Sequence, residues 1–347
     1  MADLTIFGGG IFGLAIGWEC ARRGAKVQLI ERARIGAGAS GGIVGALAPH
    51  VPENWNAKKE FQLQSLLMAE DFWAGVRAAS GLDPGYARLG RLQPLADQAA
   101  VAHAHARAAG AAALWRGRAD WRVEPGGDIW RGVSPTGLWV FDSLSARLHP
   151  RMATSALAAA IRAAGGSVTE METSADGHWP GPVVWATGAA GLAALSSDLG
   201  RTVGTGVKGQ AALFACAAQG QAQLFADGLH VVPHADGTAA VGSTTERDFA
   251  SGDETDGGLD ALIEKARALS PMLAAAPVIE RWAGVRPRAA SRAPVLGRWP
   301  GRPGHFIANG GFKIGFGMAP GVARTMADLV LEGRDTVPPG FRIEDCL

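Results

Sequence analysis

Cysteine is scarce in this 347-residue chain, which contains only Cys20, Cys216 and Cys346. The three lie far apart, their number is odd, and no CxxC pair occurs. This pattern argues against a disulfide framework, because disulfide-stabilised domains carry several closely spaced cysteine pairs. It is typical of proteins that work in a reducing compartment.

Long apolar runs and blocks of basic residues are also missing. No uninterrupted apolar run approaches the ~20 residues of a membrane-spanning helix, and no signal peptide is visible at the amino terminus. The formal net charge is only +1, so nothing indicates a nucleic-acid partner. We therefore expect a cytoplasmic protein without a transmembrane segment and without nucleic acid as a partner.

The overall composition is that of a folded globular protein. Hydrophobic residues make up 48% of the chain and charged residues 19%, which excludes a disordered polypeptide. The length allows about two domains and an extensive buried core.

The amino-terminal segment carries the most informative pattern. An apolar run at residues 4–7 leads into the motif Gly8-Gly9-Gly10-Ile11-Phe12-Gly13. A helical stretch follows, and a second apolar run at residues 27–30 ends in Glu31. This strand–turn–helix–strand order predicts a dinucleotide-binding unit in which Glu31 accepts a hydrogen bond from a ribose hydroxyl.

There is a physical reason for each glycine of this motif. Gly8 allows a tight turn, Gly10 lets the backbone approach a pyrophosphate, and Gly13 lets the helix pack closely on the strand. Ile11 and Phe12 lie at the start of the predicted helix, where free N–H groups and the helix dipole favour negative charge. The motif therefore predicts a diphosphate at the helix N-terminus.

The remaining chain alternates helical and extended segments. Apolar spacing predicts helices at residues 57–79, 96–114, 150–164, 257–270 and from about Pro320 to Glu332. Extended runs predict strands at 167–171 and 183–188, a turn-rich connection at 173–182 between them, and antiparallel strands within 208–244.

This order predicts an interleaved α/β fold with two domains. We expect a discontinuous Rossmann-like nucleotide domain built from residues 1–50, 145–205 and 285–347. A largely antiparallel α+β substrate domain is expected to comprise residues 51–144 and 206–284. No second GxGxxG motif occurs, so no separate nicotinamide domain is expected. This favours a flavin that is reduced by its own substrate.

Four blocks of the chain resemble the FAD-dependent D-amino-acid oxidase superfamily, and within it the glycine oxidase and sarcosine oxidase branch. The blocks are Gly8–Glu31, Gly36–Pro49, Val184–Gly188, and the pair Trp282–Pro287 with Asn309–Gly317. The resemblance spans the whole chain, and the last pair is its most specific part. The oxidoreductase part of the bifunctional enzyme that modifies tRNA methylaminomethyl-uridine is similar in the same blocks.

The resemblance implies FAD as the cofactor, bound without a covalent link, because no cysteine lies near the two C-terminal blocks. No metal site is expected, because His103 and His105 are two residues apart and point to different faces of a predicted helix. The glycine turn before the last helix would direct N–H groups at the flavin N1/C2 carbonyl region, which gains negative charge on reduction. The FAD-binding residues implied are Gly8, Gly10, Ile11, Phe12, Gly13, Glu31, Arg32, Ala39, Ser40, Gly45, Ala46, Leu47, Thr187, Gly188, Gly310, Gly311, Phe312, Lys313 and Ile314.

The resemblance also implies the substrate-binding residues. Arg286 aligns with the arginine that binds the substrate carboxylate in glycine oxidases, and a planar guanidinium can bind a carboxylate bidentately. Lys313 is similar to the carboxylate-binding lysine of sarcosine oxidase. Tyr86 is the one tyrosine in the chain, so the active-site tyrosines of D-amino-acid oxidase are missing. His230 stands where glycine oxidase has a tyrosine, and His50 is a second candidate for the pocket wall.

The activity implied is oxidation of the C–N bond of a small amino acid or N-substituted glycine, by hydride transfer to flavin N5. A small carboxylate-bearing amine is the expected substrate, and oxygen or a quinone the expected electron acceptor. Two alternatives stay open, a tRNA-modifying amine oxidase and a flavin-binding protein without turnover. The near-neutral charge counts against the first. The sequence does not determine the exact substrate or whether the chain forms a homo-oligomer.

Overall fold

The computed structural model describes residues 2–172, 177, 179 and 181–347. The turn-rich connection predicted at residues 173–182 therefore lies largely outside the described residues. Within them, no helix combines the length and the apolar character needed to cross a membrane. The three cysteines are buried and free.

A six-stranded sheet forms one half of the molecule, with the order β15-β16-β9-β1-β2-β8. All neighbouring strands are parallel except β15, which runs antiparallel to β16. The strands are β1 (Leu4–Phe7), β2 (Val27–Glu31), β8 (Ser167–Glu170), β9 (Val183–Trp185), β15 (Val295–Arg298) and β16 (His305–Asn309).

Both faces of this sheet are covered, which explains why its strands are almost continuously apolar. Leu4, Ile6 and Val184 pack into one core cluster with the helices α1 and α8. Phe7 and Trp185 point to the opposite face and pack beside helix α5, because successive strand residues face opposite sides. The helices are α1 (Ile11–Arg22), α4 (Pro150–Ala163), α5 (Gly188–Leu199) and α8 (Gly315–Glu332).

An eight-stranded sheet forms the other half, with the order β14-β10-β13-β12-β11-β4-β6-β5. Its pairs are antiparallel except β11 with β4. The strands are β4 (Arg91–Pro94), β5 (Trp121–Asp128), β6 (Gly132–Asp142), β10 (Gly204–Ala215), β11 (Gln223–Ala226), β12 (Leu229–Pro233), β13 (Thr238–Gly242) and β14 (Val278–Ala289).

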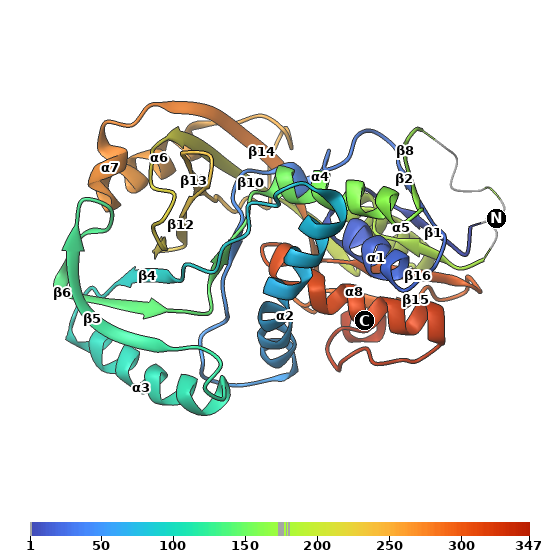
Figure 1. Cartoon of the computed structure of the whole chain (residues 1–347), viewed down its shortest axis with the longest axis horizontal. Coiled ribbons are helices and arrows are strands. Elements are labelled where there is room, and N and C mark those ends of the chain that lie inside the picture. Colours follow the sequence, from blue (N-terminus) through green and yellow to red (C-terminus); the bar gives the residue numbers. More distant parts are fainter. Residues whose placement is uncertain (1, 173–176, 178, 180) are drawn as a thin grey trace.

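Figure 1 shows the two sheets side by side, with both chain ends in the half that holds the parallel sheet. Helix α2 lies between the halves and packs against α4 and α8. A two-stranded ribbon pairs β3 (Ala46–Leu47) with β7 (Ala146–Arg147). The remaining helices are α2 (Ala57–Ser80), α3 (Gln98–Leu114), α6 (Gly257–Leu269) and α7 (Pro271–Ala274).

The last helix begins earlier than the sequence predicts. Helix α8 starts at Gly315, and Pro320 lies inside it. The prediction of a start near Pro320 was wrong because the glycines of the first turn resemble a loop in sequence, and glycine has a low helix propensity. Packing explains their presence. A Cβ at Gly317, in the first turn, would lie 3.3 Å from the Leu66 side chain of α2. One at Gly321, in the next turn, would lie 3.0 Å from the Phe61 ring, so these glycines let α8 approach α2 closely.

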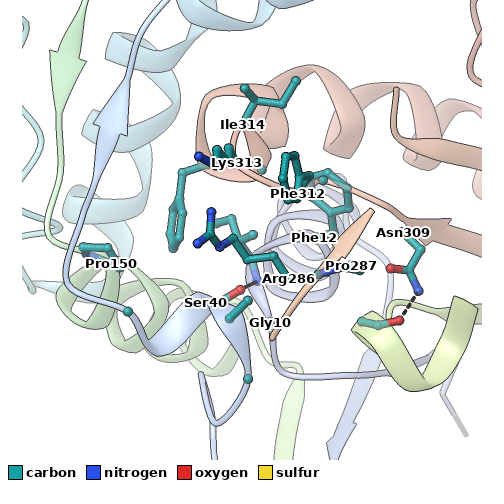
Figure 2. A pocket seen from close by; sticks show the side chains of 18 of the residues that line it. Gly10, Phe12, Ser40, Pro150, Arg286, Pro287, Asn309, Phe312, Lys313 and Ile314 are labelled. Carbon is teal, nitrogen blue, oxygen red and sulfur yellow. Dashed lines mark hydrogen bonds between the residues drawn. The ribbon is translucent and has the colours of Figure 1, made fainter. Parts of the chain in front are cut away.

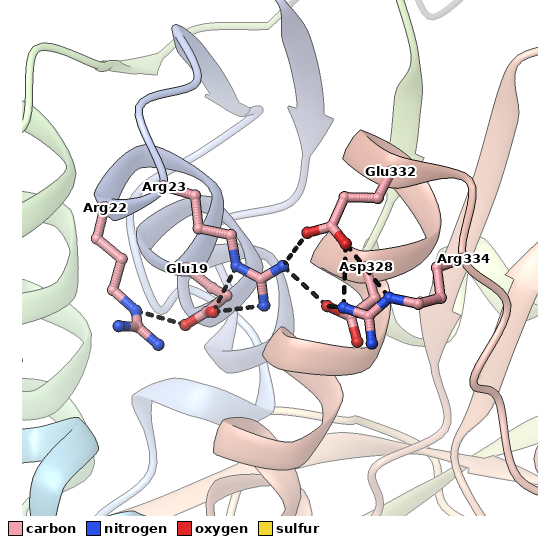
Figure 3. Close-up of polar contacts among 6 residues, drawn as sticks. All are labelled: Glu19, Arg22, Arg23, Asp328, Glu332 and Arg334. Atoms are coloured by element: carbon pink, nitrogen blue, oxygen red, sulfur yellow. Dashed lines mark hydrogen bonds and ion pairs between the residues drawn. The ribbon is translucent and has the colours of Figure 1, made fainter.

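A chain of ion pairs joins the first helix to the last (Figure 3). Glu19 is 2% exposed, and its carboxylate accepts hydrogen bonds from Arg22, in the last turn of α1, and from Arg23, directly after it. Arg23 also reaches Asp328 on α8 at 2.8 Å, and Asp328 pairs with Arg334 at the same distance. Helices from opposite ends of the chain are therefore held together by shared charges.

Replacement of Asp328 by asparagine should destabilise the protein. Asp328 is buried between two arginines, and removing its charge weakens contacts to both, so we expect the free energy of unfolding to fall by about 1–3 kcal/mol. Urea denaturation at fixed FAD concentration measures this. Glu332→Gln is the control, because Glu332 meets the same arginines with its side chain 47% exposed and should change stability by less than about 1 kcal/mol. Equal effects of the two variants would contradict the interpretation.

Candidate active site

A cavity of about 1050 Å³ opens where the two sheets meet. Its wall includes residues at the carboxyl ends of β1, β2 and β9, together with residues of β12, β14 and the start of α8. Ligands of open parallel sheets bind outside the carboxyl ends of the strands, where the strand order reverses. Here β1 lies between β2 and β9, so the cavity is at that point. Small-molecule sites are roughly 300–1,000 Å³, so this one can hold a dinucleotide and a small second ligand.

At one end of the cavity, the side chains of Glu31 and Ser40 form hydrogen bonds with the backbone of the glycine motif and the residues beside it. Glu31 accepts hydrogen bonds from the backbone of Gly9 at 2.7 Å and of Ala33 at 3.0 Å. A carboxylate has about four acceptor positions, so Glu31 can still accept from a ribose. Ser40 accepts a hydrogen bond from the N–H of Ile11 at 2.9 Å, and its hydroxyl therefore lies at the N-terminus of α1.

The glycines of this end leave no room for side chains. A Cβ at Gly8 would lie 2.3 Å from the carbonyl oxygen of Ala186, and one at Gly13 would lie 2.0 Å from the carbonyl oxygen of Gly8. Gly8 also has φ +109°, in the region that favours glycine. The turn is therefore bare backbone next to a helix N-terminus, which is the surface that a diphosphate requires.

Most of the residues predicted to bind FAD lie on the cavity wall, but four do not. Gly13, Gly45, Leu47 and Gly310 are absent from the lining. Their direct contact with FAD stays a prediction, and packing by itself explains their identity. A Cβ at Gly45 would lie 1.9 Å from the carbonyl oxygen of Leu148. Leu47 is buried in the core, and Gly310 has φ +75° in the turn before α8.

At the other end of the cavity lies Arg286, on strand β14. Its side chain is buried, and one guanidinium nitrogen donates to the backbone carbonyl of Thr244 at 2.9 Å. Within the described part of the chain, no carboxylate lies within ion-pair distance of it. Burial lowers the pKa of Arg286 to about 10, while Glu246 acts in the opposite direction. The group stays charged at neutral pH and can bind an anion.

Lys313 reaches the same part of the cavity from the turn before α8. Figure 2 shows its ammonium group near the guanidinium of Arg286. Both groups lie over the ring of Phe312, at 6.0 and 5.7 Å from its centre. Burial, and then the charge of Arg286, lower the pKa of Lys313 to about 8. Two cations therefore face one space, and Lys313 loses its proton more easily than an ordinary lysine.

His230, on strand β12, also lines this end. Its ring lies 4.6 Å from that of Phe225, and its Nδ1 is buried without a hydrogen-bond partner in the described structure. Burial, together with the charges of Arg91 and Lys313, lowers the pKa of His230 to about 3. The imidazole is therefore uncharged at neutral pH.

His50 lines the cavity wall as well. Its backbone N–H and its Nδ1 both contact the side-chain oxygen of Gln62, on α2. Burial lowers the pKa of His50, against the effect of the bond to Gln62. The contact with Gln62 fixes the orientation of the ring.

Several residues of the cavity wall were not predicted from the sequence. Arg91 is buried and paired with the fully buried Asp142 at 2.9 Å, and it lies 5.2 Å above the ring of Phe225. Trp185, Trp299 and Arg302 line the end near the parallel sheet. A single charged residue in a strand gives no sequence signal for Arg91. An aromatic residue directly before the Ala-Thr-Gly segment could have indicated Trp185.

Comparisons with known proteins agree with this geometry. The family model of the FAD dependent oxidoreductases, DAO, matches residues 3–329. Glycine oxidase of Geobacillus kaustophilus is 25% identical, over 94% of this chain and 92% of the relative. A crystal structure of glycine oxidase from that organism has a TM-score of 0.81 at 23% identity, with 99% of this chain and 98% of the other covered. Iminodiacetate oxidase from Chelativorans sp. BNC1 has a TM-score of 0.83 at 20% identity, with 98% of both chains covered.

The structural similarities support the fold, and the family model covers nearly the whole chain. The predicted fold class, a Rossmann-like FAD-binding half with an interleaved and largely antiparallel second half, is confirmed. The glycine turn, the acid at the end of β2 and the volume of the cavity all fit FAD. The chain belongs to the family of FAD-dependent oxidoreductases.

Proposed function

We propose that this enzyme oxidises the C–N bond of a small amino acid or an N-substituted glycine. The observation that carries the proposal is Arg286, a buried guanidinium that faces the cavity without a carboxylate partner among the described residues. A buried charge is costly unless it is paired, so this site favours an anionic ligand. Relatives named glycine oxidase and iminodiacetate oxidase act on carboxylate-bearing amines, which supports the same substrate class.

The division of the chain into two domains is part of the proposal. FAD would be held by residues within 1–50, 145–205 and 285–347, and the substrate would be covered by 51–144 and 206–284. In support, Glu31, Ser40 and the first turn of α1 lie at one end of the cavity, while His230 and Arg91 lie on strands of the other sheet. Bound FAD supplies the acceptor for a hydride from the substrate Cα.

The protein side chains position the substrate rather than transfer its protons. Arg286 and Lys313 would bind the carboxylate, which fixes the orientation of the Cα–H bond. His230 stays uncharged at neutral pH because its pKa is about 3, so it adds no third charge at this end. Glu31 is the one carboxylate on the described cavity wall, and it lies at the opposite end. The chemistry therefore depends on a substrate whose amine is already neutral.

The electron acceptor of the reaction is part of the proposal. Oxygen or a quinone would accept the electrons, and consumption of dissolved oxygen during turnover distinguishes the two. A cytoplasmic location and a homo-oligomeric state are proposals as well, and sedimentation of the purified protein measures the second.

Anaerobic reduction of the bound flavin tests the proposed substrate class. The panel comprises glycine, sarcosine, iminodiacetate, D-alanine, D-proline and L-proline, with methylamine and ethylamine as controls that lack a carboxylate. We expect at least one amino acid to bleach the flavin spectrum and the simple amines to react at least about a hundredfold more slowly. Equal rates with simple amines would refute a carboxylate site. No reduction by any compound, with FAD intact, would favour a flavin-binding protein without turnover.

Substitution of Arg286 by alanine should leave FAD bound and weaken the binding of the substrate. Loss of a charge-assisted contact to a carboxylate corresponds to roughly a ten- to hundredfold rise in KM, measured with the best amino acid of the panel. Arg288→Ala is a matched control, because Arg288 lies 5.6 Å from the same Phe312 ring but does not line the cavity. A KM that stays at the wild-type value in the Arg286 variant would rule out this arginine as the carboxylate site.

Binding of a simple carboxylate should depend on the protonation of Lys313. Its pKa of about 8 means that the ammonium is present below pH 8 and is lost as the pH rises through that value. The Kd of acetate, followed by the change in flavin absorbance, should stay constant from pH 6 to about 7.5 and then rise by up to about tenfold per pH unit. In Lys313→Met the Kd should be weaker and flat between pH 7 and 9. An inflection that persists in this variant would assign the titration to another group.

A further inference from the structure

The guanidinium of Arg286 occupies the space where any residue other than glycine at position 209 would place its side chain. Gly209 lies on β10, the strand that pairs with β14. A Cβ at Gly209 would lie 1.0 Å from Nη2 and 2.1 Å from Cζ of Arg286. Gly209 has no left-handed backbone conformation, so the strand itself does not require glycine here. The absent side chain is what allows the guanidinium to lie flat on the strand.

The backbone carbonyl that accepts from Arg286 is itself held by the next residue of β10. Gln210 donates its backbone N–H to the hydroxyl of Thr244 at 2.8 Å, and its carbonyl accepts from the N–H of Thr244 at 3.2 Å. The backbone carbonyl of Thr244 accepts a hydrogen bond from Nη2 of Arg286 at 2.9 Å. A guanidinium has five N–H groups, so this anchor leaves the others for a substrate carboxylate.

A group of charged side chains surrounds this anchor. The amide nitrogen of Gln210, which is fully buried, donates to Glu246 at 2.9 Å and to Asp256 at 2.7 Å. Lys208, also buried, pairs with the same two carboxylates at 3.4 and 3.1 Å. One ammonium and two carboxylates leave one net negative charge, which offsets the charge of Arg286 across the anchor. Glu246 is the carboxylate that acts on the pKa of Arg286.

We propose that Gly209 and the Gln210–Glu246 pair are positioning residues that set the place and charge balance of the Arg286 guanidinium in the substrate site. The proposal rests on the proposed function, in which Arg286 binds the substrate carboxylate. Bare backbone at Gly209 fixes the depth of the guanidinium, and the Thr244 carbonyl fixes its rotation. The carboxylate of Glu246 partly compensates the buried charge. None of these groups needs to touch the substrate.

The first test is Gly209→Ala in the FAD-loaded protein. The new methyl group displaces the guanidinium, and a misplacement of about 1 Å can cost up to about a hundredfold. We expect the KM of the best amino acid and the Kd of acetate to rise by about ten- to a hundredfold, with kcat and FAD content much less affected. Gly75→Ala is the control, because a Cβ at Gly75 meets no atom within 4 Å and should change neither constant.

A double-substitution cycle separates this effect from general damage to the sheet. Lysine at position 286 keeps a charge but not the planar group that lies on Gly209. Gly209→Ala should therefore raise the Kd of acetate by less than about twofold when it is added to Arg286→Lys. Equal losses in both backgrounds would overturn the positioning role. If Arg286→Ala leaves acetate binding unchanged, the proposed function fails instead, and this outcome is visible before the cycle is made.

Glu246→Gln keeps the proposal testable if the Gly209 variant does not fold. The amide retains an oxygen acceptor but removes the charge that compensates Arg286. We expect the Kd of acetate to change by at least about threefold, with an unchanged FAD content. Asp253→Asn removes a carboxylate whose side chain forms a hydrogen bond with Ser251 and no ion pair among the described residues, and it serves as the control. The same Kd in both variants and in the wild type would overturn the role of Glu246.

Discussion

The structure depends on the close approach of α1 to the strands β1 and β9. Gly8 and Gly13 allow it, because a Cβ at either position would lie within 2.3 Å of a backbone oxygen. With this contact in place, the N-terminus of α1 points out of the carboxyl edge of the parallel sheet. Ser40 and Glu31 then bind the backbone of the turn from two sides. A larger residue at Gly8 or Gly13 would remove the helix end from the cavity, and with it the binding surface for the diphosphate.

The charged side chains of the cavity wall come from both halves of the molecule. Glu31 lies at the end of strand β2 of the parallel sheet, while Arg286, on β14, and Lys313, before α8, lie near one another (Figure 2). Arg286 is buried, whereas the Lys313 side chain is exposed. An anion that approaches Arg286 is attracted in a medium of low effective dielectric, where a charge pair is stronger than in water. The Arg91–Asp142 pair adds a guanidinium to the wall with no net charge.

The histidines of the site show why a shortage of tyrosine is compatible with this chemistry. Burial holds the pKa of His230 at about 3 and lowers that of His50, so both rings are uncharged at neutral pH and shape the pocket as polar surfaces. In the proposed function, Arg286 orients the substrate carboxylate, and this requires no proton transfer from the protein. The side chains around Arg286 therefore matter more for geometry than for acid–base chemistry.

The sequence by itself determined the dinucleotide-binding turn, the acid at the end of β2, the interleaved order of elements and the candidate carboxylate ligand. These features are local, because glycine spacing, apolar runs and a terminal acid act within short stretches of chain. Tertiary structure alone decided that α8 begins at Gly315, that Gly45 and Leu47 lie behind the cavity wall, and that Arg91 lines it. It also placed Gly209 beneath Arg286. Contacts between strands distant in sequence leave no periodic signal in the chain, so they become visible only when the sheets are assembled.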